Sequence, residues 1–185
     1  MKMKLSHVGQ CHFGLYAKPT SSGNIPYLQA KHFDDWGHVS TPIDTCIPSN
    51  GKTRDHLLED GDVLLAGKGL RRFAWTYTED FGPAIASSIF FVIKPDPSRV
   101  VPQFLALLLN LPESRSHFQT LGAGSSVPSI RKSELLNFAL ELPPLPDQER
   151  MVRLKELHDQ DLQLSHKIID AKRNLFEAMV KKLIS

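Results

Sequence analysis

Leu142-Pro143-Pro144-Leu145-Pro146-Asp147-Gln148-Glu149-Arg150 ends a proline-rich run, and after it the sequence contains neither Pro nor Gly. Proline suits the first position of a helix, where its missing N–H costs nothing. Asp147 and Glu149 place negative charge in the predicted first turn, and two lysines place positive charge in the last, as the helix dipole favours. The sequence therefore predicts one continuous helix over residues 146–184.

Apolar residues in this helix repeat every seven positions, the pattern of a coiled coil. The stripe that would form a helix–helix seam contains Leu154, Leu157, Leu164, Ile168 and Leu175. A second stripe beside it contains Leu162, Ile169, Phe176 and Leu183. Together the two stripes span roughly 160° of the helix surface, which is wider than a two-stranded seam requires.

A helix of this length would extend for roughly 55–60 Å, farther than a compact body made from the remaining residues. We therefore expect it to need partners, with one stripe for a twin helix and the other for a second protein. The plainer alternative is a long terminal helix that packs on its own domain.

Composition limits the protein class. The chain has 185 residues, 41% of them hydrophobic, and a formal net charge of +2, which permits nucleic-acid binding without demanding it. Its two cysteines, Cys11 and Cys46, form no CxxC pair and suggest a reducing compartment. Neither a signal-peptide core nor an apolar run of membrane-spanning length, ~20 residues, is present in the sequence. We expect a soluble, cytoplasmic protein.

The residues before the proline-rich run alternate between short strands and short helices. Strands are predicted at 25–29, 62–66, 73–78, 84–93 and 138–142, and helices at 102–110, 112–121 and 129–136. No βαβ rhythm is present, so the predicted class is a mixed α+β domain over 1–145, followed by the long helix over 146–185.

Searches for catalytic motifs fail. Gly67-Lys68-Gly69 lacks the spacing and the Ser/Thr of a P-loop. Asp170-Ala171-Lys172, the one Asp/Glu-x-Lys triplet, lies inside the predicted helix, where no second carboxylate converges on a metal. The histidines show no metal-ligand spacing. We expect no catalytic residue, no metal and no cofactor in this chain.

Basic residues are concentrated in loops. In the loop 67–72 two glycines would allow close backbone approach, and Arg71 and Arg72 could donate to guanine or clamp phosphates. Solvated lysines and arginines are the ordinary alternative, and nearby Trp75 and Tyr77 are expected to pack in the core. The predicted DNA-binding set is Lys31, Lys52, Arg54, Lys68, Arg71, Arg72, Ser125, Arg131 and Lys132.

The order of segments resembles one half of a specificity (S) subunit of a type I restriction–modification system. The matching segments are Ile25-Pro26-Tyr27-Leu28, Gly61-Asp62-Val63-Leu64, Ala84 to Ile93, Phe104 to Leu109, Gly122 to Leu136 and the junction Pro143-Pro144-Leu145-Pro146-Asp147-Gln148. The junction is the most specific of them, although Asp147 replaces the usual Glu. The usual subunit has two target recognition domains and two long helices, and this sequence has one of each, as in a half-subunit or a fragment.

The resemblance implies a non-catalytic protein whose recognition domain reads one half of a split DNA target. It implies that long helices pair antiparallel and fix the spacing between half-sites. It also implies docking to modification methyltransferase subunits, which carry the S-adenosylmethionine chemistry, and through them to the restriction subunit. We expect a homodimer through the 146–184 helix. The alternatives are a DNA-binding regulator without a methyltransferase and an interaction module that contacts no DNA.

Overall fold

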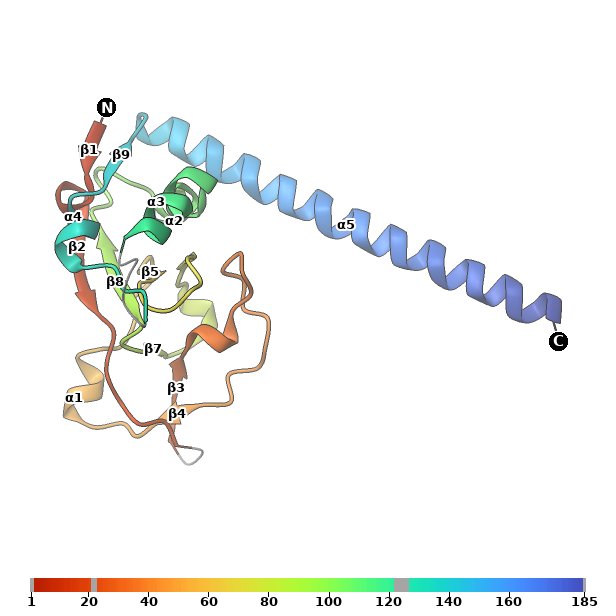
Figure 1. Ribbon diagram of the computed structural model, residues 1–185, viewed down its shortest axis with the longest axis horizontal. Coiled ribbons are helices and arrows are strands. Elements are labelled where there is room, and N and C mark those ends of the chain that lie inside the picture. The colour runs from red at the N-terminus through yellow and green to blue at the C-terminus, as the bar shows by residue number, and fades with distance from the viewer. Residues whose placement is uncertain (1, 21–22, 122–126, 185) are drawn as a thin grey trace. The chain divides into compact units, whose positions relative to one another are not determined.

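The computed structural model describes residues 2–20, 23–121 and 127–184, without the side chain of Lys52 (Figure 1). The chain divides into two compact units, Met1–Gln148 and Glu149–Ser185. The division falls inside the first turns of the long helix, so the last residues of the first unit are already helical.

The centre of the first unit is a four-stranded antiparallel sheet. Its order is β2 (Gly9–Phe13), β8 (Phe90–Pro95), β5 (Val63–Ala66) and β6 (Ala74–Thr76). The two middle strands are buried on both faces and rich in Val, Ile, Leu and Phe, as expected for strands with no solvent-exposed side. The predicted strands at 62–66 and 73–78 correspond to β5 and β6.

Two smaller sheets complete the unit. In the first, β3 (Ile25–Leu28) lies between its antiparallel neighbour β4 (Cys46–Ile47) and its parallel neighbour β7 (Ile85–Ala86). The second pairs β1 (Lys2–Lys4) with β9 (Ala139–Glu141). The prediction of one continuous strand over 84–93 is wrong. The chain turns after Ser87, so one apolar run supplies β7 to one sheet and β8 to another.

The helices cover the sheet edges and faces. They are α1 (Gly51–Arg54), α2 (Pro102–Asn110), α3 (Pro112–Thr120) and α4 (Lys132–Leu136), with short 3₁₀ turns η1 (Leu5–His7), η2 (Ala30–His32) and η3 (Glu79–Phe81). Helix α2 packs against β5 and β6, and Figure 1 shows α3 beside it. The helix predicted over 129–136 begins only at Lys132, because Ser129 and Ile130 pair with the 67–68 segment instead.

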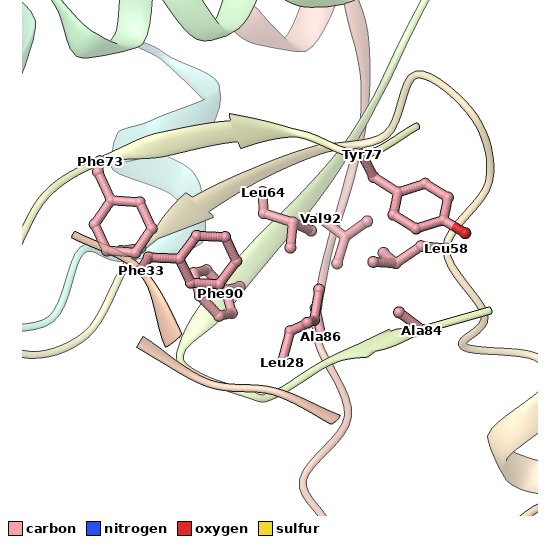
Figure 2. Packing of buried hydrophobic residues seen from close by; sticks show 11 residues of the cluster. Leu28, Phe33, Leu58, Leu64, Phe73, Tyr77, Ala84, Ala86, Phe90 and Val92 are labelled. Carbon is pink, nitrogen blue, oxygen red and sulfur yellow. The ribbon is translucent and has the colours of Figure 1, made fainter. Parts of the chain in front are cut away.

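The hydrophobic core lies between the four-stranded sheet and the β3–β7 pair (Figure 2). Alternate residues of β5 and β8, such as Leu64 and Phe90, point into it. Phe33 contacts Phe73 and Phe90, with ring centroids 5.3 and 5.7 Å apart. Trp75 packs at the border of this cluster and Tyr77 is buried in it, as the sequence predicts.

Helix α5 (Leu145–Ile184) starts within one residue of the predicted position and runs unbroken to the predicted end. The prediction of an α+β domain followed by one long helix is therefore confirmed. Every described residue of α5 from Gln160 onward is exposed, including both predicted stripes: Ile168 is 54% exposed and Ile169 53%. Pairing into an antiparallel coiled coil stays a prediction. Across the described ranges, no helix is both long and apolar enough to cross a membrane.

Candidate nucleic-acid interface

The loop between β5 and β6, residues 67–72, lies beside the segment 128–130, far along the sequence. The Ile130 amide donates to the Gly67 carbonyl and the Gly69 amide to the Pro128 carbonyl, both at 2.9 Å. Gly67 is required at the start of the loop, because a Cβ there would come within 2.4 Å of the Phe91 ring. The backbone thus brings two predicted basic loops together.

Three predicted DNA-binding cations lie on these paired segments or directly after them. Lys68, Arg131 and Lys132 are all exposed. The Lys68 ammonium lies 5.7 Å from the centroid of Phe13, a ring that packs on Phe91 and is 44% exposed. We call Phe13, Lys68, Arg131 and Lys132 the basic surface. No ion pair to a carboxylate occupies its three cations within the described ranges.

The position of Lys132 near β2 has an electrostatic signature. Burial raises the pKa of the Cys11 thiol to about 11, and the nearby Lys132 ammonium opposes that shift. A thiol held protonated in this way is a poor nucleophile, because the thiolate is the reactive form. Cys11 is therefore a packing residue of β2, with the Lys132 ammonium nearby.

Arg72 corrects the sequence-based prediction. It is 1% exposed, and its guanidinium donates to the carbonyl oxygens of Gly69 at 2.6 Å and Arg71 at 3.1 Å. Longer hydrogen bonds reach the carbonyls of Phe118 and Pro128, both at 3.4 Å. Burial lowers the pKa of this guanidinium. Arg72 therefore ties the 67–72 loop to α3 and to the 128–130 segment, a structural role that the sequence did not predict, and its burial leaves it no exposed surface for DNA.

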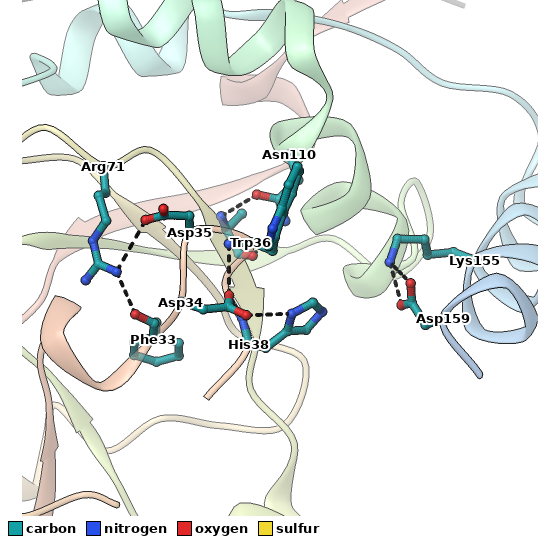
Figure 3. Close-up of polar contacts among 10 residues, drawn as sticks. Phe33, Asp34, Asp35, Trp36, His38, Arg71, Asn110, Lys155 and Asp159 are labelled. Carbon is teal, nitrogen blue, oxygen red and sulfur yellow. Dashed lines mark hydrogen bonds and ion pairs between the residues drawn. The ribbon is translucent and has the colours of Figure 1, made fainter. Parts of the chain in front are cut away.

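Arg71 is also held by the protein, although it is only half-buried. Its guanidinium donates to the carbonyls of Phe33, at 2.6 Å, and Ala30, and lies 3.6 Å from the Asp35 carboxylate (Figure 3). These hydrogen bonds engage two of the five N–H donors of the guanidinium and hold the side chain against the protein. Arg71 joins the 67–72 loop to a loop that precedes it in the sequence, residues 33–39.

The remaining predicted cations do not join the basic surface. Lys31 pairs with Asp44, where hydrogen bonds from Lys31 and His32 lower the pKa of the carboxyl to about 2. Arg54 is exposed on α1, which Figure 1 shows at the opposite end of the unit from α2 and α3. The Lys52 side chain and Ser125 lie outside the described residues.

Two aromatic residues in this region were missed by sequence reasoning. Phe13 lies at the end of β2, a strand that is not among those predicted from the sequence. Trp36 sits in the polar 33–39 loop and is 66% exposed. The signal available in the sequence was a tryptophan in a segment rich in Asp and Gly, since tryptophan is enriched in binding surfaces. Among described residues, no group of three or more His, Cys, Asp or Glu side chains could hold a metal ion.

The first unit is an α+β domain with exposed cations on its loops, and the second is an amphipathic helix with exposed apolar stripes. Residues 7–171 match the family model of the type I restriction modification DNA specificity domain. The chain therefore belongs to this family, as the resemblance in the sequence predicts. Specificity subunits of type I systems are non-catalytic, which agrees with the prediction that the chain is not an enzyme.

Known relatives are longer than this chain. The HindI specificity subunit of Haemophilus influenzae is 25% identical over 130 residues, which cover 67% of this chain and 28% of that protein. The HsdS subunit from Thermoanaerobacter tengcongensis superposes with a TM-score of 0.64 at 17% identity, over 88% of this chain and 38% of the other. The M. genitalium S subunit gives 0.63 at 14% identity, over 94% and 42%. At these identities the structural likeness shows the fold alone. The chain spans well under half the length of each.

Proposed function

We propose that this chain is a specificity half-subunit of a type I restriction–modification complex and that its first unit reads one half-site of a double-stranded DNA target. The observation that carries the proposal is the family match, which extends through the recognition domain and into α5. The basic surface supports it, because exposed cations beside an aromatic ring suit phosphate and base contacts.

The second part of the proposal concerns α5. Two copies of the chain would pair antiparallel through the seam stripe and present two identical recognition domains to a bipartite palindromic site. The second stripe would dock the modification methyltransferase subunit, which would hold S-adenosylmethionine and connect to the restriction subunit. The support for both contacts is the exposure of apolar residues on α5, because such stripes are stable in water only when a partner covers them.

The DNA part predicts a charge-dependent interaction at the basic surface. Lys68→Ala and Arg131→Ala should each weaken duplex binding and reduce the slope of log K against log salt by about 1, since each removes roughly one phosphate contact. Lys2→Ala, an exposed lysine on β1, is the matched control and should leave the slope unchanged. Gel shifts across a salt series make the measurement. Equal slopes for all four proteins would mean that the basic surface does not contact DNA.

The α5 part predicts different results for two adjacent isoleucines of equal exposure. Ile168→Asp places a charge in the seam and should convert a dimer, at twice the chain mass of 20.8 kDa, into a monomer. Ile169→Asp, on the second stripe, should leave the dimer intact and abolish co-purification with the methyltransferase subunit. Sedimentation and affinity co-purification provide the two measurements. A wild-type chain that stays monomeric at high concentration would refute the dimer.

A further inference from the structure

Trp36 lies in the turn formed by residues 33–39, which internal hydrogen bonds stabilise. Asp34 forms the centre of this turn: its Oδ1 accepts from the amides of Trp36 and His38, both at 2.8 Å, and its Oδ2 lies 3.1 Å from the His38 imidazole (Figure 3). The Phe33–Val39 bridge closes the base of the turn. An exposed tryptophan on such a frame loses little conformational entropy on binding, as in known hot spots.

The turn is fixed against the sheet as well as within itself. Gly37 has φ +86°, and a Cβ there would come within 2.6 Å of the Ala74 carbonyl of β6. Asn110 in turn holds Ala74 through two hydrogen bonds of 2.8 Å, one with its amide and one with its carbonyl. The backbone next to Trp36 therefore packs directly against β6, which sets the position of the indole.

An arginine lies over the indole of Trp36. The carboxylates of the turn are engaged within the protein: Asp34 lies 3.1 Å from the His38 imidazole, and Asp35 pairs with Arg71 at 3.6 Å. Burial alone would raise the pKa of Asp34, but the amide and imidazole donors outweigh it and keep the pKa below its ordinary value. The Arg115 guanidinium of α3 lies 5.2 Å from the centre of the indole ring. No carboxylate in the described chain pairs with it.

We propose that Trp36 is a DNA-contacting residue of the recognition domain, which inserts its indole at a base step while Arg115 pairs with the adjacent phosphate. Apolar wedges of this kind unstack base steps, and neighbouring cations fix the backbone beside them. The proposal rests on the proposed DNA-binding function and adds to it a contact outside the basic surface.

Continuity with the basic surface selects DNA over a protein partner. The 67–72 loop carries Lys68, a member of the basic surface, near one end. Near its other end, Arg71 contacts the Trp36 turn. A duplex bound across this loop would therefore meet Phe13 on one side and Trp36 on the other. The two aromatic residues and their cations would then contact separate base steps of one half-site.

Tryptophan fluorescence can test the contact directly, because Trp36 and Trp75 are the chain's two tryptophans. In the full-length Trp75→Phe variant the signal comes from Trp36 alone. Duplex enriched from a random-sequence pool by the wild-type chain is the probe. We expect this DNA to quench the emission and to protect it from acrylamide. Should Trp75→Phe fail to fold, the difference between wild type and Trp36→Phe gives the same readout.

The outcomes separate this inference from the function on which it rests. Trp36→Ala should bind the enriched duplex about tenfold more weakly, and Trp36→Phe should recover part of the loss. DNA binding without any change in Trp36 emission would overturn this inference and leave the proposed function standing. Absence of DNA binding by the wild-type chain would overturn both. A change in emission caused by the methyltransferase subunit instead of DNA would reassign Trp36 to a protein interface.

Discussion

Gln148→Leu is expected to lower the free energy of unfolding of the first unit by about 3–5 kcal/mol. Gln148 is completely buried, and its amide makes three hydrogen bonds within this unit. Its oxygen accepts from the Val101 amide at 2.9 Å, and its nitrogen donates to the carbonyls of Arg99 at 3.1 Å and Pro143 at 2.9 Å. Leucine would fill similar space but leave all three backbone groups without this partner.

Chemical denaturation followed by tryptophan fluorescence would measure the loss, since Trp75 packs against the core of this unit. Gln163→Leu is the matched control: this glutamine is exposed on α5, so the same change should shift stability by less than about 0.5 kcal/mol. Gln148→Glu should also destabilise at neutral pH, because a carboxylate cannot donate to the two carbonyls. A Gln148→Leu chain as stable as wild type would refute this anchoring role.

The same glutamine shows where sequence reasoning stops. The proline-rich junction predicts the start of α5, because Pro and the charges of the first turn act locally. The role of Gln148 is not local, since its partners Val101 and Arg99 lie 47 and 49 residues away in the sequence. The long helix was predictable from its seven-residue repeat and the buried strand β5 from its turn and apolar run, because each pattern is contained in or next to its own element.

The candidate site was predictable only in part. The local sequence does not distinguish Lys68, Arg71 and Arg72, because all three lie in one glycine-containing basic loop. Their roles differ because backbone carbonyls from distant segments converge on the two arginines and not on the lysine. The pairing of 67–69 with 128–130, which brings Arg131 to the site, is likewise a tertiary feature without a local signal.

Arg72→Met is expected to destabilise the first unit by about 2–4 kcal/mol, a loss that follows from the carbonyls it would leave behind. Removing the charge relieves a desolvation cost, and that gain limits the loss. Four backbone oxygens nevertheless lose a donor, those of Gly69, Arg71, Phe118 and Pro128. The last two lie in α3 and in the 128–130 segment, which the Arg72 side chain connects to the 67–72 loop. Because the loop carrying Lys68 is held by these contacts, DNA affinity should fall as a consequence of the loosened loop.

Arg131→Met separates direct from indirect effects on DNA binding. Arg131 is exposed, so its replacement should weaken DNA binding while stability changes by less than about 0.5 kcal/mol. Arg72→Met should reduce both the stability and the DNA affinity. Arg72→Lys keeps the charge but offers fewer donors, so its stability and affinity should lie between those of Arg72→Met and wild type. Denaturation midpoints and gel shifts on the same preparations give the comparison. If Arg72→Met kept full stability and lost only DNA affinity, Arg72 would be a DNA contact after all, because a buried tie between loops cannot be removed without cost to the fold.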